Sequence, residues 1–105
     1  MHKILSPLKY ILARKLQNTQ WRCDPSSEAT AEFYQLNFID SSKVKGYSKS
    51  FDEVEAQLMF NANFFFKSKT IIQFFNADES FTAHLDDEYT LTATIDDETL
   101  IFKKQ

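Results

Sequence analysis

The sequence predicts a mainly β fold, with an N-terminal helix followed by about eight antiparallel strands in a meander. Three observations lead to this fold class. Apolar and polar residues alternate with a period of two through most of residues 21–103, turn-forming segments interrupt the alternation, and one stretch with helical spacing precedes it. Eight antiparallel strands either close into a barrel or form a strongly bent sheet, and we expect the barrel-like form because closure removes unpaired edges.

The size and composition predict one compact domain over residues 1–105. The chain has no linker or internal repeat, and its 43% apolar content includes eleven phenylalanines that supply core volume. A single cysteine excludes an internal disulfide, and the first fifteen residues lack the apolar run of a secretory signal. We therefore expect a cytoplasmic protein.

Residues 6–18 have the pattern of an amphipathic helix. Ser6 suits the N-cap and Pro7 the first helical position, where its missing N–H is harmless. One apolar stripe recurs at helical spacing and consists of Leu8, Ile11, Leu12 and Leu16. We expect this helix to pack against the sheet, with attachment to a membrane surface as the alternative.

The strands follow in order after residue 20. Alternation predicts strands near residues 21–23, 34–38, 44–48, 56–66, 70–76, 81–85, 89–95 and 100–102. The polar run 44–48 is expected at a sheet edge or over a wet face, whereas 70–76 is apolar on both faces and is expected to be central or covered by the helix. Residues 50–55 fit either a strand or a helical turn, because Ser50 and Glu53 have capping-box spacing.

Charge is divided unevenly along the chain. Eight acidic residues and no basic ones fall between Asn76 and Glu98. They form three groups, each between two alternating runs: Asp78 and Glu79; Asp86, Asp87 and Glu88; Asp96, Asp97 and Glu98. Because successive turns of a meander alternate between its ends, the first and third groups should share one end. The groups suit ordinary solvated turns, calcium ligands or a docking surface for a basic partner, and the spacing lacks the pattern of a helix–loop–helix calcium site.

Other residue patterns exclude several function classes. One glycine cannot build a phosphate-binding loop, and two histidines with one cysteine argue against a structural zinc site. A nucleophilic pair of Cys23 and His84 is conceivable. Paired carboxylates for glycoside cleavage could also come from the turns, but carboxylates in solvated turns would not have the raised pKa of a general acid. The net charge of −3 disfavours nucleic acid, although Lys45-Gly46-Tyr47 partly fits an RNA-binding strand. We expect no enzyme, no metal and no cofactor.

Phenylalanines cluster in residues 64–66 and 74–75. They could fill the core or line a cavity for an apolar ligand. Phe65 and Phe75 break the alternation, so we expect them to be exposed contacts for a partner or cover for the helix.

Two resemblances extend this interpretation. Asn18-Thr19-Gln20-Trp21, after a short helix and opening the first strand, resembles the start of lipocalin-type (calycin) barrels, although Thr19 stands where those barrels usually have glycine. The last two strands, 89–95 and 98–102, also look calycin-like. This resemblance implies a small-molecule pocket.

The chain also resembles immunity proteins of bacterial toxin systems, including contact-dependent growth inhibition, in its size, acidity and lack of catalytic motifs. That resemblance implies a non-enzymatic inhibitor that covers the active site of a basic toxin nuclease. We expect such a protein to be a monomer alone and a heterodimer with its partner, without binding nucleic acid or membrane. A calycin-like carrier of a small apolar ligand is the alternative.

Overall fold

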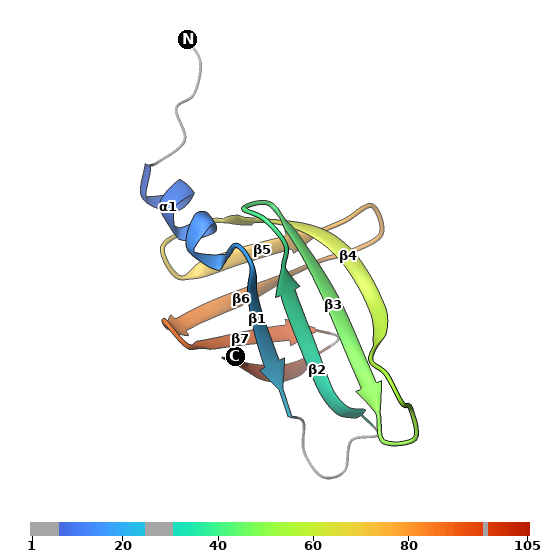
Figure 1. Cartoon of the computed structure of the whole chain (residues 1–105). Coiled ribbons are helices and arrows are strands. Elements are labelled where there is room, and N and C mark those ends of the chain that lie inside the picture. The colour runs from blue at the N-terminus through green and yellow to red at the C-terminus, as the bar shows by residue number, and fades with distance from the viewer. Residues whose placement is uncertain (1–6, 25–30, 96) are drawn as a thin grey trace.

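A computed structural model describes residues 7–24, 31–95 and 97–105 of the chain. In this part of the chain, helix α1 (Pro7–Leu16) precedes eight strands (Figure 1). The strands are β1 (Thr19–Cys23), β2 (Ala31–Phe38), β3 (Lys43–Ser50), β4 (Gln57–Phe66), β5 (Ile71–Phe75), β6 (Ser80–Asp87), β7 (Thr90–Ile95) and β8 (Glu98–Lys104). The predicted fold class, a helix followed by an antiparallel meander, is confirmed.

The strands form a closed barrel in chain order. Each strand pairs antiparallel with its chain neighbours, and β8 returns to β1 through the pairs Trp21↔Lys104 and Arg22↔Lys103. Closure selects the barrel over the bent sheet. It also makes the edge position expected for residues 44–48 wrong, because β3 pairs with both β2 and β4. The lysines of β3 therefore lie on the outer face of the barrel and do not protect an unpaired strand edge.

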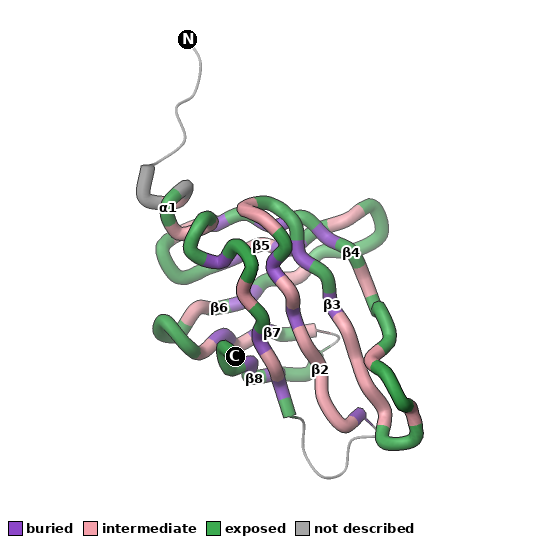
Figure 2. Tube along the Cα trace, in the orientation of Figure 1, coloured by how far each residue is buried: buried purple, intermediate pink, exposed green. Residues whose placement is uncertain are grey.

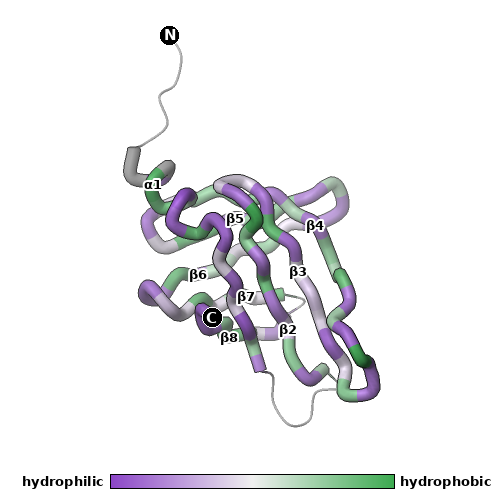
Figure 3. The backbone as a smooth tube through the Cα atoms, in the orientation of Figure 1, coloured by the Kyte–Doolittle hydropathy of each residue, from purple (hydrophilic) through white to green (hydrophobic). Residues whose placement is uncertain are grey.

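The core lies inside the barrel because every second side chain of a strand points inward. Buried and exposed residues alternate along the strands (Figure 2), as do hydrophobic and hydrophilic ones (Figure 3). Phenylalanines pack at its centre: the Phe74 ring stacks on Phe81 at 4.7 Å between centroids, and Phe38 meets Phe64 edge-on at 5.0 Å. The largest fully buried side chains are those of Trp21, Phe38, Phe74, Phe102, Leu36, Ile72, Leu91 and Val44.

Helix α1 covers one end of the barrel. Leu16 is buried in the core, and Leu12 and Ala13 pack against it. The helix ends where Asn18 takes a left-handed conformation, with φ of 61°, which Asn tolerates better than most residues. The predicted helix is thus present, while its expected cap at Ser6 lies outside the described residues. No helix in the described ranges is long and apolar enough to cross a membrane.

The loops alternate between the two ends of the barrel. The turns that follow β2, β4 and β6 lie at the end covered by α1, and those that follow β3, β5 and β7 lie at the opposite, open end (Figure 1). Residues 51–56 connect β3 to β4 as turns and bends, so they form neither of the two expected elements. One hydrogen bond of a capping box still forms there, because the Ser50 N–H donates to Glu53 Oε1 at 2.8 Å. No helix follows it.

The outer face of β5 is not covered by the helix, contrary to one expectation for residues 70–76. Ile71 and Phe75 are 37% and 39% exposed, because α1 lies across the end of the barrel and not along this wall. The segment is apolar on both faces because Ile72 and Phe74 face the core while Ile71 and Phe75 face solvent.

Gly46 makes room for an aromatic ring inside the barrel. It pairs with Phe60 across β3 and β4, and a Cβ at Gly46 would stand 2.4 Å from Cζ of that ring. We expect Gly46→Ala to destabilise the fold by about 1–3 kcal/mol, because the ring must move. Urea denaturation checks this value. The control is Gly46→Ala in a Phe60→Ala background, where the penalty should vanish; an equal penalty in both backgrounds would contradict the steric explanation.

Candidate functional site at the open end of the barrel

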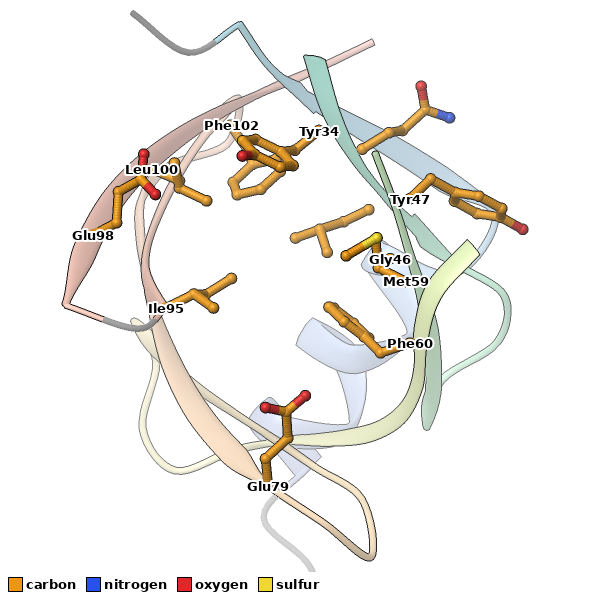
Figure 4. A pocket seen from close by; sticks show the side chains of 12 residues that line it. Tyr34, Gly46, Tyr47, Met59, Phe60, Glu79, Ile95, Glu98, Leu100 and Phe102 are labelled. Carbon is orange, nitrogen blue, oxygen red and sulfur yellow. The ribbon is translucent and has the colours of Figure 1, made fainter. Parts of the chain in front are cut away.

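A cavity of about 260 Å³ lies in the barrel interior toward the open end. Figure 4 looks into it along the barrel, with α1 across the far end. Its inner wall is mostly apolar and aromatic and is built by Leu36, Phe60, Ile95, Leu100 and Phe102. Tyr34 adds a phenol to this wall. The cavity is therefore an apolar space with one mouth, since the helix occupies the other end.

Two carboxylates stand at the mouth of this cavity. Glu98 precedes Leu100 by two residues on β8, so the alternation turns its side chain inward. Glu79 lies directly before β6, and its side chain also lines the cavity. Figure 4 shows Glu79 and Glu98 on different sides of the mouth. Among the described residues, the cavity lining includes no lysine or arginine. The mouth is therefore negative.

Two further carboxylates lie in the same turns. Asp78 and Asp97 are exposed. The Asn76 side chain shapes the first turn, because its Oδ1 accepts the backbone N–H groups of Asp78 at 2.9 Å and Glu79 at 3.0 Å. Asp97 has φ of 64°, a conformation in which Asp and Asn are favoured over most other residues. We call the four carboxylates of Asp78, Glu79, Asp97 and Glu98 the acidic rim.

The structure brings the 78–79 and 97–98 carboxylates to one end of the barrel, as a meander predicts. Asp96, which was expected with them, lies outside the described residues. Within the described part of the chain, the ion pairs are Arg22–Asp24, Lys49–Glu32 and His84–Asp86. None of them includes a rim carboxylate. The cationic side chains in the described ranges therefore leave the rim charge uncompensated by direct contact.

The carboxylates of Asp86, Asp87 and Glu88 lie at the opposite end, beside α1. Their surroundings differ from those of the rim, because Lys15, Lys69 and Lys104 line the same recess. The Asp87 Oδ1 accepts the Tyr89 N–H at 2.8 Å and so shapes the β6–β7 turn. These three candidates do not join the acidic rim.

Asp86 is held by its own neighbours. Its carboxylate accepts a hydrogen bond from the Thr92 hydroxyl at 2.6 Å and contacts Nδ1 of His84 at 2.9 Å. The Thr92 hydrogen bond, followed by that of His84, lowers the pKa of Asp86 below its ordinary value. The carboxylate is thus engaged in a local network on the outer wall.

Phe65 and Phe75 lie on the outer wall formed by β4 and β5, and Phe75 borders the β5–β6 turn that carries Asp78 and Glu79. Their side chains are 49% and 39% exposed, and the two rings meet edge-on at 5.8 Å. The expectation of exposure is met. The two rings form an apolar patch on the outside of the barrel, next to the turn of the acidic rim.

Sequence reasoning missed the exposed apolar residues of the open end itself. Phe51 is 69% exposed and Val54 is 93% exposed, both in the β3–β4 loop. Met59, next to them on β4, is 62% exposed and also lines the cavity. The sequence held one signal for this exposure. Val54 stands between Glu53 and Glu55 in a segment without regular alternation, so no strand or helix would turn its side chain toward the core.

The residues considered for catalysis are not brought together. Cys23 is buried inside the barrel on β1, and burial is the main reason why the pKa of its thiol is raised. His84 is exposed on β6, which does not neighbour β1. In the described part of the chain, no group of three His, Cys, Asp or Glu residues is placed to hold a metal ion.

The fold and this site define a small up-and-down β-barrel with one end closed by a helix and the other open and acidic. Comparison with protein-family models, curated proteins and solved structures finds no match to the chain. The resemblances to calycin barrels and immunity proteins stay predictions. The features that bear on function are the cavity and the acidic rim at the open end.

Proposed function

We propose that this chain is a non-catalytic inhibitor that holds a basic protein against the open end of its barrel. In its most specific form, it is a cytoplasmic immunity protein that covers the active site of a toxin nuclease. The observation that supports this function best is the acidic rim, whose four carboxylates make no ion pair within the described residues.

The charge of this end extends beyond the rim. Asp52, Glu53 and Glu55 lie in the β3–β4 loop at the same end of the barrel. A surface of one sign raises the encounter rate with an oppositely charged partner, and like charges keep nucleic acid away. A nuclease active site is a fitting target, because it must be basic to hold phosphates.

Charge alone does not hold a complex together, since exposed ion pairs contribute little. The open end also carries apolar side chains, because Phe51, Val54 and Met59 are more than half exposed. Such residues supply the desolvated centre that specific interfaces need. The patch of Phe65 and Phe75 would then lie outside the interface or at its margin. In this proposal the protein is a monomer alone and forms a heterodimer with its toxin.

The test is genetic. The reading frame immediately upstream of this one is expressed, and its basic C-terminal domain is assayed for growth arrest. We expect co-expression of this chain to restore growth, and the variant Asp78→Lys/Glu79→Lys to restore it much less at equal protein level. Growth arrest that this chain does not relieve, or an upstream frame with no basic toxin domain, would overturn the proposal.

A second candidate function is the carriage of a small apolar ligand. The cavity of about 260 Å³ favours it, because its wall is apolar and its mouth is open. Native mass spectrometry of the gently purified protein tests it directly. A bound small molecule of constant mass would support the carrier, and an empty protein that binds no small apolar probe would contradict it.

A further inference from the structure

We propose that the cavity selects a small organic cation, with an apolar body inside the barrel and a protonated amine at the mouth, in the negative potential of Glu79 and Glu98. This inference rests on the second proposed function, carriage of a small ligand. It adds the chemical class and the orientation of the ligand, and it assigns a recognition role to two particular carboxylates.

The volume limits the size of the ligand. If each non-hydrogen atom takes about 30 Å³, as a water molecule does in the liquid, the cavity holds roughly nine such atoms. A benzene ring with a two-carbon chain and an amine has this size. Longer lipids would extend into solvent, because α1 closes the far end of the barrel.

The wall chemistry sets the orientation. An apolar body gains most by contact with Leu36, Leu100 and the Phe102 ring, deep in the barrel. The charged head then stays at the mouth, where it remains partly hydrated and lies in the negative potential of the two carboxylates. The rings of Tyr34 and Phe60 line the same cavity and add apolar surface for the body of the ligand.

The charge at the mouth decides between head groups. A carboxylate head would face two like charges and no lysine or arginine in the described lining. A neutral head would meet no repulsion and no ion pair. Because Glu79 and Glu98 are themselves exposed, solvent screens the attraction, so selection should be moderate. We expect the amine to bind about tenfold tighter than the alcohol.

The experiment compares three ligands with one body: phenethylamine, 2-phenylethanol and phenylacetate. Isothermal titration calorimetry at neutral pH and low salt, supported by amide chemical shifts, measures binding to the full chain. We expect the amine to bind tightest and phenylacetate weakest, with shifts at Ile95, Leu100 and Phe102. Added salt should reduce the advantage of the amine over the alcohol.

Two matched variants test the residue assignment. Glu79→Gln/Glu98→Gln should bring the amine and the alcohol to equal affinity while the alcohol still binds. Asp78→Asn/Asp97→Asn removes the same charge from rim residues outside the cavity lining, and Asn suits the left-handed backbone of Asp97. This control should keep most of the preference for the amine.

The outcomes separate this inference from the function on which it rests. Equal binding of all three ligands to the unaltered chain would overturn cation selection while leaving a carrier in place. Binding of none would remove the carrier and the selection together. A preference for the amine that survives Glu79→Gln/Glu98→Gln would show that other groups select the cation and would overturn the assignment of these two carboxylates.

Discussion

Replacement of Phe74 by alanine should destabilise the barrel by about 3–5 kcal/mol. The ring is fully buried and packs against Phe38, Phe64 and Phe81 from three other strands. Its removal leaves a cavity that a closed barrel cannot collapse, because the paired backbone fixes the positions of the walls. A domain of this size has a free energy of unfolding of about 5–15 kcal/mol, so the variant should lose from about a fifth to all of its stability.

Phe75→Ala is the matched control. The same atoms are removed one residue along the same strand, but this ring points outward and is 39% exposed. We expect a loss below about 1.5 kcal/mol from its contact with Phe65. Urea denaturation of both variants decides the comparison. Equal losses at the two positions would contradict the inward and outward assignment of β5, and with it the register of the barrel.

Reversal of charge at the rim should slow association with the proposed basic partner by about 10- to 1,000-fold at low salt. The variant is Asp78→Lys/Glu79→Lys, which leaves Asp97 and its left-handed backbone unchanged. Dissociation should change less, because steering acts on the encounter and exposed ion pairs contribute little to the bound state. Stopped-flow mixing over a range of salt concentrations measures both rates.

The control for this variant carries the same change of net charge at the other end. Glu88→Lys/Gln17→Lys/Gln105→Lys also adds four positive charges, at exposed positions beside the end covered by α1. At physiological salt we expect it to slow association far less than the rim variant does, because the screening length there is about 8 Å. If both variants slow association equally, only net charge matters and the rim has no special role.

Local patterns were sufficient to predict the meander. Alternation in residues 81–85 and 89–95 assigns strands, and the three acidic residues 86–88 between them assign a turn, so these neighbouring strands must pair antiparallel. Closure could not be predicted in the same way. It depends on pairing between Trp21 and Lys104, which are far apart in sequence, and no local pattern at either residue indicates the other as its partner. The position of α1 likewise depends on which end of the barrel its buried Leu16 can reach.

The candidate site was predicted in part. The sequence placed the 78–79 and 97–98 turns at one end, because a meander alternates its turns. It did not reveal that Asp86 would be held by Thr92 and His84, since that network depends on cross-strand register. The inward direction of Glu98 was available from the alternation, which continues through Leu100. The cavity depends on packing, which no local pattern encodes.

The most direct measurement of the central claim, that negative potential gathers at the open end, needs no partner. Amide protons of the isolated chain are broadened separately by a cationic and an anionic nitroxide of the same size, and the ratio of the two effects reports the local potential. We predict the highest preference for the cationic probe at residues 76–79, 97–99 and 51–56, and a clearly lower one around Lys15 and Lys69. A uniform ratio along the chain, or a maximum at residues 86–88, would contradict the account.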